Sequence, residues 1–207
     1  MINGNIPDIV VGRLPRYLLT LQHMAKVGQR TTSSKELGEK MGYSAAQIRK
    51  DLSQFGEFGK QGTGYDIAFL IKQLQEILHL EKVWEIALVG AGDLGHAIAR
   101  YQGFLNRGFF VKIVFDNDPQ KIGKKIGEYE IHHTSEMADL IKENKIKIAM
   151  LTVPAVVAQS VAEELVNAGV KAILTYAPMM LNLPGNIQVQ YIDPILQIQH
   201  MTYYLES

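Results

Sequence analysis

A glycine-rich stretch in the middle of the chain constrains the fold most. Residues 85–99 read EIALVGAGDLGHAIA, an apolar run followed by glycines at positions 90, 92 and 95 and then by helical spacing. The first glycine permits a tight turn, the second lets backbone approach a pyrophosphate, and the third lets helix pack closely on strand. The motif predicts a strand, a turn and a helix whose N-terminal N–H groups and positive dipole end face the phosphates of a dinucleotide.

Asp116 strengthens this interpretation. The apolar run Phe110–Phe115 predicts the next strand, and Asp116 follows 21 residues after the last glycine of the motif, where a carboxylate can accept hydrogen bonds from an adenosine ribose. The same carboxylate would repel a 2′-phosphate, so we expect NAD(H) rather than NADP(H), although lysines at 121, 124 and 125 weaken that preference. The alternative is an ordinary strand-to-helix turn with Asp116 as a solvated strand end.

Composition excludes several classes of function. The chain has 207 residues, 47% of them hydrophobic, which suits one large or two small globular domains. Cysteine is absent, which rules out disulfides, thiolate catalysis and thiolate metal sites, and we expect no bound metal. No stretch approaches the roughly 18 apolar residues of a membrane helix and no signal sequence is evident, so we expect a cytoplasmic protein without membrane contact.

The charge is distributed unevenly along the chain. Residues 1–80 hold 10 Lys and Arg against 7 Asp and Glu, net +3, and the remainder holds 11 against 14, net −3. This bias is too small to establish nucleic-acid binding, so the motifs of the basic part must decide.

Three short helices are expected in the basic part. The first spans Leu14–Val27 and ends at Gly28; the second begins among the hydroxyls of residues 31–34 and runs to Lys40. Ser44 caps a third helix over residues 45–55. The apolar side chains expected to face inward from the first two helices are Leu14, Leu18, Leu21, Ala25, Leu37 and Met41. Two short helices joined by a glycine-containing turn predict a helix-turn-helix, with the third helix as the recognition helix.

The third helix has two distinct faces. Ile48, Leu52 and Phe55 share one stripe, which leaves a polar face of Gln47, Arg49, Lys50, Ser53 and Gln54. Arginine and lysine can reach phosphates or guanine edges, while glutamine and serine can bond bases or backbone. For this helix taken alone, the solvated face of an ordinary amphipathic helix is the favoured interpretation.

The segment after this helix favours DNA. Residues 56–65 contain four glycines and a lysine, a composition typical of a tight hairpin or wing, with Lys60 at its tip near phosphates or the minor groove. A flexible linker between domains is the alternative.

The rest of the chain predicts alternating strands and helices. After a helix over residues 67–80 and a domain boundary near 79–83, strands are expected over 146–153, 170–174 and 187–192, with helices over 156–167 and 194–205. We therefore expect an α/β fold with a parallel sheet: a DNA-binding domain over 1–80, a Rossmann domain over 81–192 and a C-terminal helix over 193–207.

These motifs resemble the Rex family of redox-sensing transcriptional repressors over nearly the whole chain. The matching segments are RLPRY (13–17), SAAQIRKDLSQFGEFGK (44–60), GAGDLG (90–95), FDNDPQKIG (115–123), LTVPA (151–155), AGVKAIL (168–174) and YAP (176–178). The resemblance implies a homodimer with N-terminal winged-helix domains, a Rossmann domain for NAD(H), and a C-terminal helix that swaps into the partner subunit. In that family NADH lowers operator affinity, whereas NAD+ competes for the same site and leaves the protein able to bind DNA.

The motifs and the resemblance together assign candidate residues. Cofactor contacts are expected from Gly90, Ala91, Gly92, Asp93, Leu94, Gly95, Asp116, Asn117, Lys121, Thr152, Val153, Pro154, Tyr176, Ala177 and Pro178. Contacts to double-stranded operator DNA are expected from Ser33, Ser34, Ser44, Gln47, Arg49, Lys50, Ser53, Lys60 and Gln61. The resemblance also implies an interface or relay role for Tyr101 and Asp193.

Four positions depart from the family pattern. Asp93 replaces the usual asparagine at the phosphate loop, where a carboxylate disfavours cofactor unless it points away. Leu19 stands where many members carry an arginine thought to pair with Asp193 and Tyr101, which puts that relay in doubt. Gln54 and Gln61 replace tyrosine and arginine, so operator preference or salt dependence is expected to shift.

The function expected is a redox-sensing repressor that binds an inverted-repeat operator as a homodimer and is released by NADH. The neutral dihydronicotinamide should enter the apolar surroundings of Pro154, Tyr176 and Pro178 more readily than the oxidised, cationic ring. An NAD-dependent dehydrogenase with an appended helical domain is the alternative, but His96 suits a surface role and His132 and His133 are expected in a polar loop. A CoA- or nucleotide-binding module without DNA affinity is a third possibility.

Overall fold

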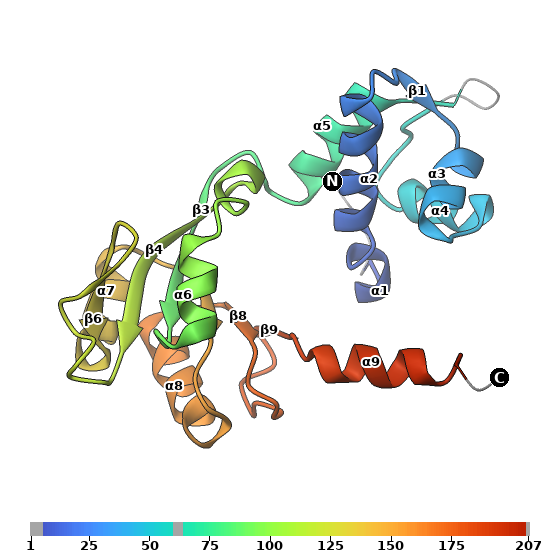
Figure 1. Ribbon diagram of the computed structural model, residues 1–207. Helices are drawn as coiled ribbons and strands as arrows, with labels where there is room; N and C mark the ends of the chain where they lie inside the picture. The colour runs from blue at the N-terminus through green and yellow to red at the C-terminus, as the bar shows by residue number, and fades with distance from the viewer. Residues whose placement is uncertain (1–5, 60–63, 206–207) are drawn as a thin grey trace. The chain divides into compact units, whose positions relative to one another are not determined.

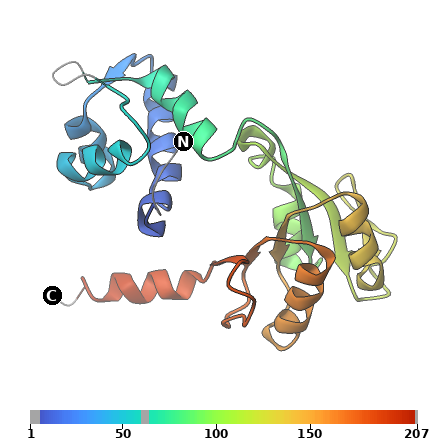
Figure 2. The same ribbon diagram turned by 180° about the vertical axis from the view of Figure 1, so that it is seen from behind.

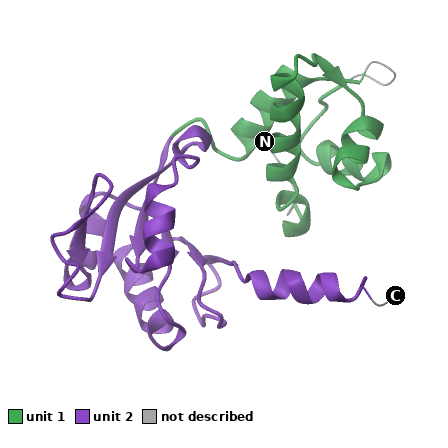
Figure 3. Cartoon of the chain, in the orientation of Figure 1, with its two compact units in different colours: residues 1–82 green, residues 83–207 purple. Residues whose placement is uncertain are grey.

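The chain folds into two compact units. The computed structural model describes residues 6–59 and 64–205, and its contacts divide the chain between Lys82 and Val83 (Figure 3). None of the helices within those described ranges is long and apolar enough to cross a membrane.

The first unit is mainly helical. Its elements are α1 (Asp8–Val11), α2 (Leu14–Lys26), β1 (Thr31–Thr32), α3 (Ser34–Met41), α4 (Ala45–Ser53), β2 (Tyr65–Asp66) and α5 (Ile67–Ile77). The expected caps are confirmed: Ser33 accepts from the Glu36 N–H and Ser44 from the Gln47 N–H, while Gly42 ends α3 in the left-handed conformation. α3 and α4 are thereby the two members of a helix-turn-helix.

One apolar core holds this unit together. Leu14, Tyr17 and Leu21 of α2 pack with Leu37, Ile48, Leu70 and Leu74 from the other helices, all of them fully buried. The expectation that Ala25 faces inward is wrong, because Met24 fills the buried position and Ala25 is exposed. At the last turn of α2 the larger side chain of Met24, one residue earlier, lies on the buried face.

The second unit contains a twisted sheet and its helices. Its elements are β3 (Trp84–Val89), α6 (Asp93–Arg100), η1 (Leu105–Arg107), β4 (Phe109–Asp116), β5 (Lys125–Ile126), β6 (Tyr129–His133), η2 (Thr134–Glu136), α7 (Met137–Glu143), β7 (Ile148–Leu151), α8 (Ala155–Ala168), β8 (Ala172–Thr175), β9 (Gln188–Tyr191) and α9 (Pro194–Thr202).

The strand order identifies a doubly wound sheet. Within the described residues seven strands run in the order β5-β6-β4-β3-β7-β8-β9, and every pairing except that of β5 with β6 is parallel. The first strand, β3, lies in the interior, and the chain proceeds outward from it in both directions. This is the Rossmann order, in which ligands bind where the direction reverses, outside the carboxyl ends of the strands.

Both faces of the sheet are covered. Along β3, Ile86 and Leu88 face a cluster shared with α6, whereas Ala87 and Val89 face a cluster shared with α7 and α8. α6 accordingly lies on one side of the sheet and α8 on the other in both views (Figures 1 and 2). Because Ile86–Val89 of β3 are buried on both faces, this part of the strand is a continuous apolar run rather than an alternating one.

Residues 125–143 differ from the sequence analysis. They form β5, β6, η2 and α7, where no element was assigned, and His132 and His133 end β6 instead of lying in a polar loop. The reason is pairing: β6 lies parallel to β4, with Phe115 opposite His132 and Asp116 opposite His133. A strand with so many polar residues gives a weak apolar signal, and its partner strand supplies the missing stabilisation.

Candidate functional sites

Four loops meet at one edge of the Rossmann sheet. They follow β3, β4, β7 and β8. The first carries the glycine motif, the second begins directly after Asp116, the last residue of β4, and the other two carry Thr152–Pro154 and Tyr176–Pro178. Because these strands are parallel neighbours, their carboxyl ends lie together at the point where the strand order reverses. The candidate cofactor residues, which are scattered over nearly 90 positions in sequence, therefore converge on one edge.

The glycine motif has the geometry of a phosphate loop. Gly90 has φ +104°, a conformation that L side chains rarely adopt, and a Cβ on Gly95 would lie 1.9 Å from the carbonyl oxygen of Gly90. A Cβ on Gly92 would meet no heavy atom within 4 Å, so this backbone is open on the side where a ligand would approach. The first N–H groups of α6 have no partner within the helix, and the residues therefore fit a dinucleotide pyrophosphate.

Asp116 is buried beside this loop and fully engaged. Its Oδ2 accepts from the Ala91 N–H at 2.6 Å and from Lys121 Nζ at 3.1 Å, and its Oδ1 accepts from the Asp118 N–H at 2.9 Å. Burial alone would raise the pKa of Asp116, but the hydrogen bonds from Asp118, Ala91 and Lys121 outweigh it and hold the pKa below its usual value. The carboxylate is thus an anion that shapes the phosphate loop, a role beyond the ribose contact expected from sequence.

The loop after β7 supports the glycine motif from the other side. Thr152 Oγ1 donates to the carbonyl oxygen of Gly90 at 2.7 Å and also lies 3.1 Å from that of Val89. Val153 is partly buried and Pro154 is exposed at the N-terminus of α8. The threonine hydroxyl is therefore committed to the backbone of the phosphate loop.

The segment after β8 is fixed at both of its ends. The Ala177 N–H donates to Thr175 Oγ1, while the Gln159 amide pairs with both backbone groups of Asn182 at 2.9 Å. Tyr191 OH accepts from the Leu181 N–H at 3.0 Å. Tyr176 is partly buried, which raises the pKa of its phenol, and Pro178 is exposed. The latch formed by Gln159 has no counterpart in the sequence analysis, because nothing in its sequence neighbourhood distinguishes it from other helical glutamines.

The remaining candidates on this edge are accessible. Asp93, Leu94 and Asn117 are exposed, and Lys121 is partly exposed. Asp93 lies in the first turn of α6, where its negative charge interacts favourably with the helix dipole.

The polar residues of the helix-turn-helix lie on the neighbouring helices α3 and α4. Ser33 and Ser44 cap α3 and α4, and Arg49 Nη1 donates to Ser34 Oγ at 3.0 Å, joining the two helices. Lys50 and Ser53 are exposed on the same helix, and Gln47 is partly buried. Lys60 and Gln61 lie outside the described residues. Gly59 and Gly64 are close to each other, since a Cβ on Gly59 would lie 2.6 Å from the Gly64 carbonyl oxygen.

The sequence analysis missed a buried polar cluster in the first unit. Asp51 of α4, 1% exposed, accepts hydrogen bonds from Arg13, Tyr17 and Gln47. Burial would raise the pKa of Asp51, yet these three donors hold it below its usual value, and the same carboxylate raises the pKa of Arg13. Two signals were available: Asp51 lies three residues after the buried Ile48, and Arg13 and Tyr17 share a face of α2 at four-residue spacing.

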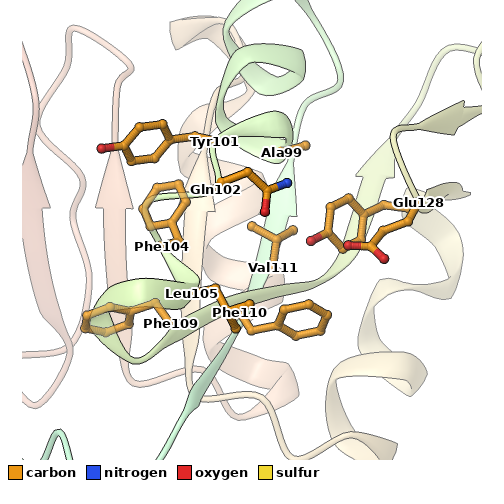
Figure 4. Close-up of a pocket in the computed structure, with 10 residues that line it drawn as sticks. Ala99, Tyr101, Gln102, Phe104, Leu105, Phe109, Phe110, Val111 and Glu128 are labelled. Carbon is orange, nitrogen blue, oxygen red and sulfur yellow. The ribbon is translucent and has the colours of Figure 1, made fainter.

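Tyr101 follows α6, and Asp193 precedes α9. Tyr101 is 55% exposed at the end of α6 and packs edge-on against Phe104, beside an aromatic pocket that Phe109, Phe110 and Tyr129 also line (Figure 4). Asp193 caps α9 by accepting from the Ile195 N–H at 2.9 Å. Leu19, where an arginine would complete the relay, is an exposed apolar residue.

His132 and His133 of the second unit serve local structure. His133 Nδ1 lies 2.7 Å from Ser135 Oγ and caps η2, and His132 Nδ1 lies 3.5 Å from Glu136. In the ranges 6–59 and 64–205, no three His, Cys, Asp or Glu side chains are grouped to hold a metal ion.

A helix-turn-helix unit followed by a Rossmann unit with an open phosphate loop defines a class: DNA-binding proteins that carry a nucleotide-binding domain. Models of protein families agree with both halves, since residues 5–53 match a putative DNA-binding protein N-terminus and residues 81–179 match a CoA binding domain.

Relatives specify the family. The redox-sensing transcriptional repressors Rex of Chloroflexus aurantiacus and Carboxydothermus hydrogenoformans are 51% and 42% identical, each alignment covering 96% of this chain and 94% and 95% of the relative. A crystal structure of the protein RSP with β-NAD+ and operator DNA has a TM-score of 0.92 at 39% identity, covering 98% of this chain and 94% of RSP. RSP with β-NADH has a TM-score of 0.89 at 36% identity, covering 98% and 95%. The chain belongs to the Rex family of redox-sensing transcriptional repressors.

Proposed function

We propose that this protein is a redox-sensing repressor that binds an inverted-repeat operator as a homodimer and leaves it when NADH occupies the Rossmann unit. NAD+ competes for the same site without releasing DNA. The observation that supports this most is the coexistence, on one chain, of an open phosphate loop with a polar helix-turn-helix surface. The solved relative RSP has been captured with β-NAD+ and operator DNA and with β-NADH.

The cofactor contacts proposed are those of the four loops. The N–H groups at the start of α6 and the open backbone of Gly92 hold the pyrophosphate, and the loops after β7 and β8 surround the nicotinamide end. Asp116 keeps the phosphate loop in shape through Ala91 and disfavours a 2′-phosphate near Lys121. NADH and NAD+ bound here supply a ring that is neutral when reduced and cationic when oxidised.

Discrimination between the two forms is assigned to the loops after β7 and β8. Tyr176 and Ala177 are partly or fully buried, and Pro154 and Pro178 add apolar surface beside them. A neutral ring is transferred into such surroundings at lower free energy than a cationic one. A ligand shifts a conformational equilibrium only by its differential affinity, and the buried ring provides that difference.

The homodimer is assigned to the C-terminal helix. No residue of α9 is buried, although the helix carries large apolar side chains. Ile195, Leu196, Ile198 and Met201 are each at least 57% exposed. A helix with so much exposed apolar surface is typical of one that packs against another chain. A dimer with two-fold symmetry presents its two copies of α4 to the two halves of an inverted repeat.

We further propose that the protein is not an enzyme and acts in the cytoplasm. His132 and His133, which end β6, are engaged in a contact with Glu136 and a local cap rather than directed to a reacting group. Sustained turnover of NAD(H) with any small alcohol, aldehyde or hydroxy acid would contradict this part of the proposal.

Fluorescence anisotropy of a labelled inverted-repeat operator tests the proposed switch. The operator complex is titrated with NADH and, separately, with NAD+. NADH is expected to release the operator at concentrations at which NAD+ does not, and a mixture should show NAD+ opposing the release. Equal release by both cofactors would eliminate redox sensing while leaving DNA binding intact.

A further inference from the structure

The buried carboxylate of Asp51 is saturated with donors. Its Oδ2 accepts from Arg13 Nε at 2.6 Å and from Tyr17 OH at 2.5 Å, and its Oδ1 accepts from Arg13 Nη2 at 2.7 Å and from Gln47 Nε2 at 2.6 Å. Two of the four donors belong to Arg13, just before α2, one belongs to the buried Tyr17 of α2, and the fourth comes from the partly exposed Gln47 of α4. Asp51 therefore links the core to a side chain of the DNA-facing surface.

This arrangement fixes the orientation of the Gln47 amide. A carboxylate only accepts hydrogen bonds, so Gln47 must direct its NH₂ group toward Asp51 and cannot exchange the places of its oxygen and nitrogen. Within the described residues, no hydrogen bond engages the carbonyl oxygen Oε1 or the remaining N–H of this partly exposed side chain, so both are available to a ligand. A glutamine on a solvated helix would instead sample many rotamers and both amide orientations.

The position of Gln47 makes this orientation relevant to DNA. Ser44 caps α4, so Gln47 is the third residue of the helix, and the first turn of a recognition helix is the part that contacts base edges. An acceptor beside a donor matches the adenine edge in the major groove, where N6 donates and N7 accepts. Arg49, two residues later, contacts Ser34 instead.

We propose that Gln47 reads one adenine in each half of the operator, and that Asp51, held by Arg13 and Tyr17, is the positioning residue that fixes its amide for this task. The proposal rests on the proposed function, because it requires α4 to enter the major groove. It adds that specificity at one base pair depends on a cluster that does not itself touch DNA.

A Gln47→Met variant tests whether Gln47 recognises an adenine. The exchange keeps the length of the side chain and removes its hydrogen-bonding groups, so discrimination against the other bases should fall about tenfold at one A·T pair per half-site. Binding is measured against operators carrying each single-base change. Gln22→Met makes the same exchange at an exposed position of α2 and should leave discrimination at that base pair as in the parent protein. A loss spread evenly over all operators in Gln47→Met would overturn the proposal.

A triple variant, Arg13→Met, Tyr17→Phe and Asp51→Leu, tests the positioning role. Apolar replacement of a buried ion pair commonly preserves the fold, so the core is retained while Gln47 loses its anchor. Positioning predicts that the triple variant, folded by circular dichroism, loses the same base-pair discrimination as Gln47→Met. If the cluster merely holds α4 to α2, the triple variant keeps full discrimination, and the positioning role is wrong.

The mobility of the Gln47 side chain can be measured in the parent protein, so this test of the positioning role does not depend on a variant that folds. Nuclear magnetic resonance relaxation of the Gln47 side-chain amide, in the absence of DNA, should give an order parameter near the rigid value of about 0.85. A value below about 0.6 would mean a mobile side chain and would overturn the positioning role. The proposed repressor function fails separately, if no inverted-repeat operator is bound by the parent protein at all.

Discussion

At the scale of single residues, the phosphate loop depends on two glycines for opposite reasons. Gly95 has no room for a side chain, because a Cβ would lie 1.9 Å from the Gly90 carbonyl oxygen, whereas a Cβ on Gly92 would point into open space. Gly95 is therefore required by the fold of the loop itself. Gly92 is required only if something must approach the backbone there.

Two alanine variants separate these requirements. Gly95→Ala should be destabilised by about 1–3 kcal/mol through overpacking, and should lose NADH binding with its loop geometry. Gly92→Ala should unfold at nearly the same temperature as the parent protein and still weaken NADH about tenfold or more, because its methyl group occupies the space of the pyrophosphate. Thermal unfolding and a fluorescence titration with NADH check both. Unchanged NADH affinity in Gly92→Ala would contradict the assignment of the site.

Lys50 should contribute to DNA binding through its charge alone. It is exposed on α4, and a lysine contact to phosphate releases a counterion without reading sequence. Lys50→Ala should weaken operator and unrelated DNA alike, and should lower the slope of log K against log salt by about 1 per subunit. Affinity measured at several salt concentrations gives the slope, and a loss confined to one base pair would contradict a phosphate role.

At the scale of elements, the sequence predicted those helices and strands whose formation depends on interactions between residues close together in the chain. The helices α2 to α5, the caps at Ser33 and Ser44, and β3 with its glycine turn were predictable because caps, periodicity and glycine turns are encoded within a few residues. The short helix α1 was not predicted. β6 was not predictable, since its polar strand forms by pairing with β4. The Asp51 cluster joins residues 38 positions apart, a distance at which a single sequence gives little information.

The stability that the contact between α4 and α2 contributes should be lost at acidic pH. Asp51 has a folded-state pKa below its unfolded value of about 3.9, so its contribution to stability is fully present above that pH and is lost as pH falls through the folded pKa. Stability should therefore decline below about pH 4, and Asp51→Asn should be less stable at neutral pH with a shallower decline in acid. Denaturant unfolding at several pH values measures this, and parallel curves for the two proteins would contradict it.

At the scale of the whole molecule, the apolar α9 is expected to make the dimer. Removing residues 194–207 should leave the two units folded, because no α9 residue is buried within the chain. The shortened protein should sediment as a monomer and bind an inverted repeat about 100-fold more weakly, since the avidity of two linked recognition helices is lost. A shortened protein that remains a dimer would assign the interface elsewhere.

The central claim is a free-energy coupling between the cofactor edge of the sheet and the recognition helix. Coupling is reciprocal, so operator DNA must weaken NADH by the same factor by which NADH weakens operator. The most direct test is the dissociation constant of NADH for the free protein and for the protein saturated with operator. The account predicts a value at least about fivefold weaker on the operator complex, matched by the reverse titration. Equal NADH affinity in the two states would contradict it.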